Sequence, residues 1–212
     1  SDLEMTLKTS IAIEDVQEEG EIAVPAKLLT DSLKEFPDLP LQFSTEANED
    51  ILNISWMSGA SKIPFFPADD YPALPELGDM AISATFPSPI LLTGINNTIY
   101  ATAEDEIRPV MNGIFFDMTP ESTTLVATDS HKLVYYTRND VRAAEKCSFI
   151  LPKKPAAILR TLLGKSDDIV KVTFDMKNAY FEFEGNILIC RLQEGTYPAY
   201  RSVIPKNNPN KL

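Results

Sequence analysis

The only histidine in the chain, His131, directly follows an aspartate and a serine, and these three residue types make the triad of many hydrolases. A hydrolase would need the side chain of Ser130 or Asp129 to turn toward the imidazole. Adjacent residues of a strand point to opposite faces of the sheet, so these neighbouring side chains diverge. The chain also contains no Gly-x-Ser-x-Gly elbow and no glycine-rich phosphate loop. We therefore expect this segment to form a turn or a binding surface, and we predict no catalytic residue.

Acidic residues are the other abundant source of chemistry, and they gather in short runs at 69–70, 104–106 and 167–168. None of these runs has the Asp or Asn ladder with a glycine that builds a calcium loop. No histidine or cysteine stands beside them to complete a transition-metal site. The acidic runs are therefore predicted to be solvated loops, with no metal ion and no cofactor.

Positive charge is concentrated on one predicted helix. The chain has a net charge of −12, which alone argues against nucleic acid as a partner, but a net charge is a sum and leaves room for a small basic face. At about 100° per residue, a helix over 152–163 groups its apolar side chains on one side: Ile158, Leu159, Leu162 and Leu163. The basic residues lie on the opposite half: Lys153, Lys154, Arg160 and Lys165. This pattern fits either a solvated lysine face or a surface that faces phosphates.

The composition is that of an ordinary soluble globular protein. The 212 residues are 44% hydrophobic and 24% charged, and no apolar run approaches the ~18 residues that span a membrane. The two cysteines, Cys147 and Cys190, have no metal-type spacing and are too few for a disulfide framework. We expect both to be reduced core residues of a cytoplasmic protein.

Hydrophobic periodicity and proline positions predict the elements that must position these residues. Two helices begin at a proline, over 25–36 and 152–163, and a third is expected after Pro87. Strands are predicted from alternating or β-branched runs; they lie near 2–8, 41–45, 51–56, 81–86, 113–118, 122–127, 132–137, 169–175, 179–184 and 187–192. The predicted fold class is α+β, with antiparallel sheets and two helices per domain on one face.

Three landmarks recur along the chain at a nearly constant offset. Ser1-Asp2 stands 127 positions before Thr128-Asp129, and residues 24–27 stand 127 positions before residues 151–154. The Tyr-Pro-Ala run at 71–73 stands 126 positions before the same run at 197–199. An internal repeat of this length is a repeated domain rather than a solenoid unit. We therefore expect residues 1–80 to be the C-terminal two-thirds of a first domain and residues 81–212 to be a complete second domain.

The segment over 197–205 holds apolar side chains between prolines. Such a stiff connector either packs on a neighbouring domain or lines a groove for a partner peptide. Composition alone favours packing.

These segments resemble a known family, the bacterial DNA sliding clamps, which are the beta subunits of DNA polymerase III. The resemblance rests on residues 2–5, Asn112-Gly113, 127–133, 151–154 and 197–206, in the family's order and spacing. It implies tandem domains of the DNA-clamp fold, three per subunit, of which the third is absent from this chain. It also implies a homodimeric ring around duplex DNA, with helices lining the channel and sheets outside.

The resemblance implies two sets of site residues. A peptide-binding groove would use Met111, Thr128, Ser130, His131, Lys132, Leu133, Pro198 and Val203. A DNA-facing surface would use Lys153, Lys154, Arg160 and Lys165, together with Arg108 from the otherwise acidic loop 104–109. The chain departs from the family pattern at Ser130, where glycine is common, and at Lys132, where arginine is common.

The implied function is a non-catalytic processivity clamp that encircles duplex DNA without reading its sequence. It would tether the DNA polymerase III alpha subunit, the clamp loader and repair polymerases through short peptide motifs. Two alternatives stay open. One is a peptide- or protein-binding scaffold with no DNA role, which the acidic charge favours, and the other is a hydrolase built on Ser130 and His131.

Overall fold

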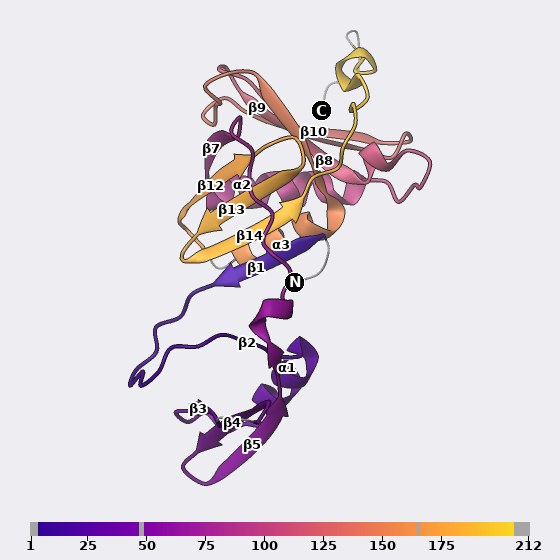
Figure 1. Ribbon diagram of the computed structural model, residues 1–212. Helices are drawn as coiled ribbons and strands as arrows, with labels where there is room; N and C mark the ends of the chain where they lie inside the picture. The colour runs from indigo at the N-terminus through magenta and orange to yellow at the C-terminus, as the bar shows by residue number, and fades with distance from the viewer. Residues whose placement is uncertain (1–3, 47–48, 165, 206–212) are drawn as a thin grey trace. The chain divides into compact units, whose positions relative to one another are not determined.

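The computed structural model describes residues 4–46, 49–164 and 166–205, which fall into two compact units (Figure 1). The larger unit contains the described residues up to 11 and those from 75 onward, and the smaller unit contains those between 12 and 74. None of the described helices is long and apolar enough to cross a membrane.

Two antiparallel sheets form the larger unit. The five-stranded sheet has the order β1-β14-β13-β12-β7 and consists of β1 (Met5–Thr9), β7 (Ile82–Pro87), β12 (Ile169–Phe174), β13 (Asn178–Phe183) and β14 (Asn186–Arg191). The four-stranded sheet has the order β10-β9-β8-β11 and consists of β8 (Gly113–Met118), β9 (Thr123–Thr128), β10 (Leu133–Arg138) and β11 (Cys147–Pro152). Short 3-10 helices complete the unit: η2 (Ile99–Ala101), η3 (Pro109–Met111) and η4 (Tyr200–Ser202).

Two helices, α2 (Ser88–Thr98) and α3 (Lys153–Leu163), contact each other and pack against the four-stranded sheet (Figure 1). Pro87 and Pro152 each end a strand and immediately precede a helix, where the missing N–H of proline costs no helical hydrogen bond. The strands therefore pass directly into the helices. The predicted α+β class, with antiparallel sheets and two helices in this domain, is confirmed.

The core of the larger unit lies between these layers. Buried and half-buried residues alternate along β13, because successive side chains point to the core face and to the outer face of the sheet. Aromatic rings fill the centre: Phe116 stacks on Phe149 at a centroid distance of 4.5 Å and meets the edge of Phe86 at 6.2 Å. Cys147 and Cys190 are buried and unpaired, as expected.

The smaller unit is built around one helix and a three-stranded sheet. It contains β2 (Ile22–Ala23), α1 (Ala26–Glu35), β3 (Gln42–Thr45), β4 (Ile51–Trp56), β5 (Gly59–Pro64), β6 (Phe66–Pro67) and η1 (Ala68–Asp70). Its core is small, with Leu52, Ile54 and Ile63 buried. Helix α1 has no fully buried residue, and Leu28 and Leu33 on it are 42% and 40% exposed.

The tandem repeat is present in the order of the elements. Helix α1 begins 127 positions before α3, at Ala26 and Lys153. Strands β3, β4 and β5 begin 127 positions before β12, β13 and β14, respectively. In both copies the three strands are antiparallel neighbours in the same order. Both copies are therefore built on one topology.

The structure differs from the predicted elements at several places. The predicted strand near 2–8 is seen as Met5–Thr9 and lies on the edge of the five-stranded sheet, while residues 1–3 lie outside the described residues. Strands β5 and β11 were not predicted. Strand β11 holds three consecutive buried apolar residues, at 149–151, because one of its faces meets the core and the other a second cluster. Strand β5 ends at a proline that suggested a connector.

Candidate functional site

The turn between β9 and β10 is shaped by the carboxylate of Asp129. Its Oδ1 accepts the backbone N–H groups of His131 and Lys132 at 3.0 and 2.9 Å, and its Oδ2 lies 2.5 Å from Lys132 Nζ. Thr128 Oγ1 donates to the Lys132 carbonyl at 2.8 Å, which closes the same turn. The Lys132 ammonium and the two N–H groups hold the pKa of Asp129 well below its ordinary value. Asp129 is therefore an ionised structural group in this turn.

Ser130 occupies a backbone conformation that glycine favours, with φ of 76°. Its Oγ accepts a hydrogen bond from Arg108 Nη1 at 2.6 Å and donates to Met111 Sδ at 3.5 Å. Within the part of the chain that the structure describes, neither this hydroxyl nor the Asp129 carboxylate bonds to the His131 imidazole. The Ser130 hydroxyl thus ties the turn to Arg108, and the geometry gives the hydrolase alternative no support.

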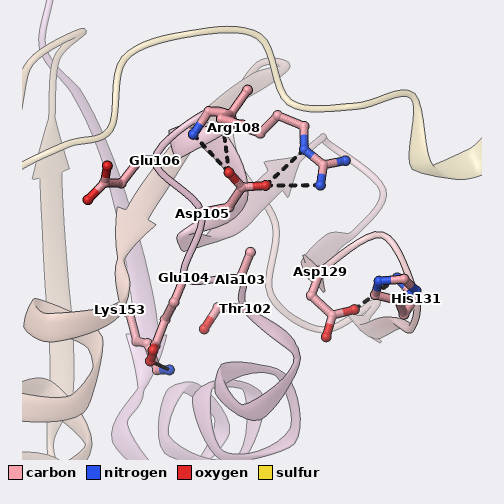
Figure 2. A pocket seen from close by; sticks show the side chains of 10 residues that line it. Thr102, Ala103, Glu104, Asp105, Glu106, Arg108, Asp129, His131 and Lys153 are labelled. Carbon is pink, nitrogen blue, oxygen red and sulfur yellow. Dashed lines mark hydrogen bonds and ion pairs between the residues drawn. The ribbon is translucent and has the colours of Figure 1, made fainter.

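The loop that carries Arg108 is braced from within (Figure 2). Asp105 Oδ1 accepts the Ile107 N–H at 2.8 Å, and its Oδ2 accepts Arg108 Nε and Nη2 at 3.0 and 2.9 Å. These bonds, led by the one from Ile107, lower the pKa of Asp105. Asn112 adds two hydrogen bonds to the backbone of Asp105, at 2.9 and 3.0 Å. The loop therefore holds the Arg108 guanidinium in one place, against the turn.

An open hollow of about 650 Å³ lies between this loop, the turn and the start of α3 (Figure 2). It is lined by Thr102, Ala103, Glu104, Asp105, Glu106, Ile107, Arg108, Asp129, His131 and Lys153. On one side of it, Lys153 Nζ lies 2.6 Å from Glu104 Oε1. The hollow brings His131, expected in the peptide groove, together with Arg108 and Lys153, expected to face DNA. Residues that the sequence assigned to two different sites thus meet at one place.

The connector that follows β14 is anchored on the four-stranded sheet. Tyr197 stacks on Phe115 at a centroid distance of 4.7 Å, and the Tyr200 hydroxyl donates to Asp117 Oδ2 at 2.7 Å. Arg201 Nη2 reaches the same oxygen at 3.0 Å. Burial, and then the neighbouring Asp117, raise the pKa of Tyr200 to about 12, so its hydroxyl keeps its proton at neutral pH. The connector therefore packs within this unit.

The residues expected in the groove occupy three segments of the larger unit. Leu133 packs in a cluster with Tyr197 and Tyr200, the two tyrosines that flank Pro198 in the sequence. Met111, whose sulfur meets Ser130, is buried, whereas Val203 is 67% exposed. The turn and the connector thus share one apolar cluster, and their joint use as a groove stays a prediction.

The basic residues expected on α3 are accessible to different degrees. Lys154 and Arg160 are exposed, whereas Lys153 is partly buried, with 42% of its side chain exposed. Lys165 lies outside the described residues. Ile158, expected on the inner face, is 37% exposed, so that part of the prediction is wrong. The buried face of α3 instead consists of Pro155, Ala156, Leu159 and Leu163, because α3 also packs against α2.

The sequence analysis missed the carboxylates that organise these segments. Asp105 stands three positions before Arg108, a spacing at which an ion pair was recognisable from the sequence. Asp117 and Tyr200 are 83 positions apart, and Glu104 and Lys153 are 49 apart. Nothing local in the sequence marks such pairs, because the fold alone brings them together.

Tandem α+β copies that share one topology are typical of sliding clamps. Two family models match this chain. The model of the DNA polymerase III beta subunit N-terminal domain matches residues 1–75, and the model of its central domain matches residues 85–199. The chain belongs to the family of the DNA polymerase III beta subunits. The resemblance expected from the sequence is thereby confirmed.

Relatives and solved structures agree with this assignment. A beta sliding clamp of Synechococcus elongatus is 28% identical over 97% of this chain and 55% of its own length. A beta sliding clamp of Staphylococcus epidermidis is 29% identical over 100% of this chain and 58% of its own length. The crystal structure of the DNA polymerase III subunit beta from Pseudomonas aeruginosa matches with a TM-score of 0.90 at 26% identity, over 98% of this chain and 57% of that one. The chain therefore spans little more than half the length of the relatives it matches.

The strained turn at Ser130 yields a test of the local energetics. Ser130→Ala keeps the side-chain carbon at a positive φ and removes the hydroxyl bonds, whereas Ser130→Gly removes the same bonds and relieves the backbone. We expect the glycine variant to be more stable than the alanine variant by about 1 kcal/mol. Urea unfolding of both variants measures the difference. An alanine variant at least as stable as the glycine variant would show that residue 130 carries no strain.

Proposed function

We propose that the complete protein is a DNA sliding clamp, a ring that holds duplex DNA by encircling it and that docks replication proteins. Residues 1–80 would be the C-terminal two-thirds of its first clamp domain and residues 81–212 its second, with a third domain completing the subunit. The role is non-catalytic, and its place is the cytoplasm. The observation that carries the proposal is how strand β1 pairs.

Strand β1 comes from the first copy of the repeat by sequence and completes the sheet of the second copy. It pairs antiparallel with β14, from Met5 opposite Cys190 to Thr9 opposite Asn186. Shifted by 127 positions, β1 corresponds to β10 and β14 corresponds to β5. Both β10 and β5 are edge strands of their sheets. Each therefore offers an edge at which the same pairing recurs with another copy of the domain.

Repeated pairing of this kind supports a closed assembly. A contact between two different surfaces that recurs from copy to copy makes either a ring or an open fibre, according to whether the rotation closes. The family membership favours the ring. Two subunits joined head to tail would then give both β10 and β5 a partner strand.

The partner held by such a ring is duplex DNA, contacted through its phosphates. Lys153, Lys154 and Arg160 lie on one helix that carries no acidic residue. Point charges on long side chains attract the backbone without reading the bases. The net charge of −12 leaves the rest of the surface acidic, which limits how tightly DNA is gripped.

Charge reversal on α3 tests the DNA-facing surface. In the complete protein, changing Lys153, Lys154 and Arg160 together to glutamate should weaken loading and retention on duplex DNA. Since the contacts are electrostatic, the difference from the unchanged protein should shrink as salt rises. The measurement is retention of the variant and of the unchanged protein on duplex DNA at salt concentrations between about 50 and 200 mM. Unchanged retention at low salt would remove α3 from the DNA-facing surface and favour the scaffold alternative.

We further propose that the polymerase alpha subunit, the clamp loader and repair polymerases dock through short peptides at the turn and the connector. A leucine or phenylalanine anchor of such a peptide needs an apolar pocket. Leu133, Met111, Pro198 and Val203 would supply its walls, and Thr128, Ser130, His131 and Lys132 its polar rim. Burial of one anchor contributes about 1.5–3 kcal/mol.

Truncation of two wall residues tests this second site. Leu133→Ala combined with Val203→Ala should weaken binding of a clamp-binding peptide by more than about 1 kcal/mol, which is an increase in Kd of about fivefold or more. Met176→Ala is the matched control, because Met176 is 89% exposed in a turn between β12 and β13. Titration of one peptide into the three proteins gives the affinities. Equal affinities for all three would move the peptide site elsewhere.

A further inference from the structure

The cations at the start of α3 are already engaged by carboxylates from other parts of the chain. Lys153 Nζ lies 2.6 Å from Glu104 Oε1, and Lys154 Nζ lies 3.3 Å from Glu4 Oε2. Arg160 makes no ion pair with any described residue. Two of the three basic residues that would face DNA thus hold an anion of the protein itself.

The Glu104 carboxylate is held beside Lys153 by a chain of backbone contacts. The Lys153 N–H donates to the Asn112 carbonyl at 3.0 Å, and the Ala103 N–H donates to the Met111 carbonyl at 2.9 Å. Asn112 also makes the two hydrogen bonds to the backbone of Asp105. The loop residues on both sides of Glu104 are therefore tied to the segment that touches the helix start. This placement belongs to the fold rather than to a chance meeting of two long side chains.

Both members of the pair remain open to solvent and to a ligand. The Glu104 side chain is 79% exposed and that of Lys153 is 42% exposed. The hydrogen bond and the charge of Lys153 lower the pKa of Glu104, so the carboxylate is ionised at neutral pH. A phosphate that approaches Lys153 must therefore compete with an anion already in contact with it.

We propose that Glu104 sets the affinity of this surface for DNA, by occupying Lys153 as an internal mimic of a phosphate until the duplex displaces it. The inference rests on the proposed function. When Lys153 releases a phosphate, it can pair with Glu104 again, and this lowers the free energy needed to break the lysine–phosphate contact. The contact is therefore exchanged easily between successive phosphates, which suits a protein that moves along its DNA.

Neighbouring acidic residues allow a matched test in the complete protein. Glu104→Gln and Glu106→Gln each remove one negative charge from the same loop, but Glu106 forms no ion pair with any described residue. Fluorescence anisotropy with a labelled duplex at about 100 mM salt gives the affinities. Removal of an exposed ion pair corresponds to about a two- to fivefold change. We expect Glu104→Gln to tighten binding by this factor and Glu106→Gln to tighten it distinctly less.

Lys153→Gln completes a double-mutant cycle and separates the two possible failures. The loss of binding caused by Lys153→Gln should be larger in the Glu104→Gln background than in the unchanged protein. If the two glutamine variants bind equally while Lys153→Gln still weakens binding, only net charge matters; the role of Glu104 is then wrong and the DNA-facing surface stands. If Lys153→Gln has no effect in either background, Lys153 does not contact DNA, and both the role of Glu104 and the place of Lys153 in the DNA-facing surface are wrong. Equal melting temperatures of the variants verify that folding is unchanged.

Discussion

An open sheet edge has to be paired or covered, and this constraint organises the whole chain. Unpaired N–H and C=O groups at an edge invite association with any other strand. Here β14 is closed by β1, and the ladder continues beyond both strand ends through Arg191 N–H to the Glu4 carbonyl at 2.8 Å and Ser10 N–H to the Gly185 carbonyl at 3.3 Å. Backbone pairing needs no particular side chains. The same strand pairing can therefore form between copies of the domain whose sequences have diverged.

The charged side chains are not spread evenly over the molecule, because basic and acidic residues are paired locally. A net charge of −12 coexists with a helix whose polar side chains are all basic or neutral. The acidic loop 104–109 contacts that helix through the pair of Glu104 with Lys153, and within the loop Asp105 pairs with Arg108. The same loop reaches the turn through Arg108 and Ser130. One hollow thereby connects the surface proposed for DNA with the edge of the surface proposed for peptides.

The parts of this structure that depend on local patterns could be predicted from the sequence. A proline directly before the first helical residue marked all three helices, and the nearly constant offset of about 127 positions marked the repeat. The parts that depend on distant contacts could not. The alternation of β11 is lost over 149–151 because its two faces meet two apolar clusters, and the exposure of Ile158 follows from how α3 meets α2. The pairing of Glu104 with Lys153 bridges 49 positions and has no local signature.

The central claim is that the complete protein holds DNA by topology, and retention on closed and open DNA tests it most directly. The complete protein would be loaded onto a labelled circular plasmid, and its dissociation followed before and after a single cut that linearises the plasmid. The account predicts slow dissociation from the circle, even at salt that screens the lysine contacts, and rapid loss from the linear form by sliding off the ends. Equal dissociation from circular and linear DNA would contradict it.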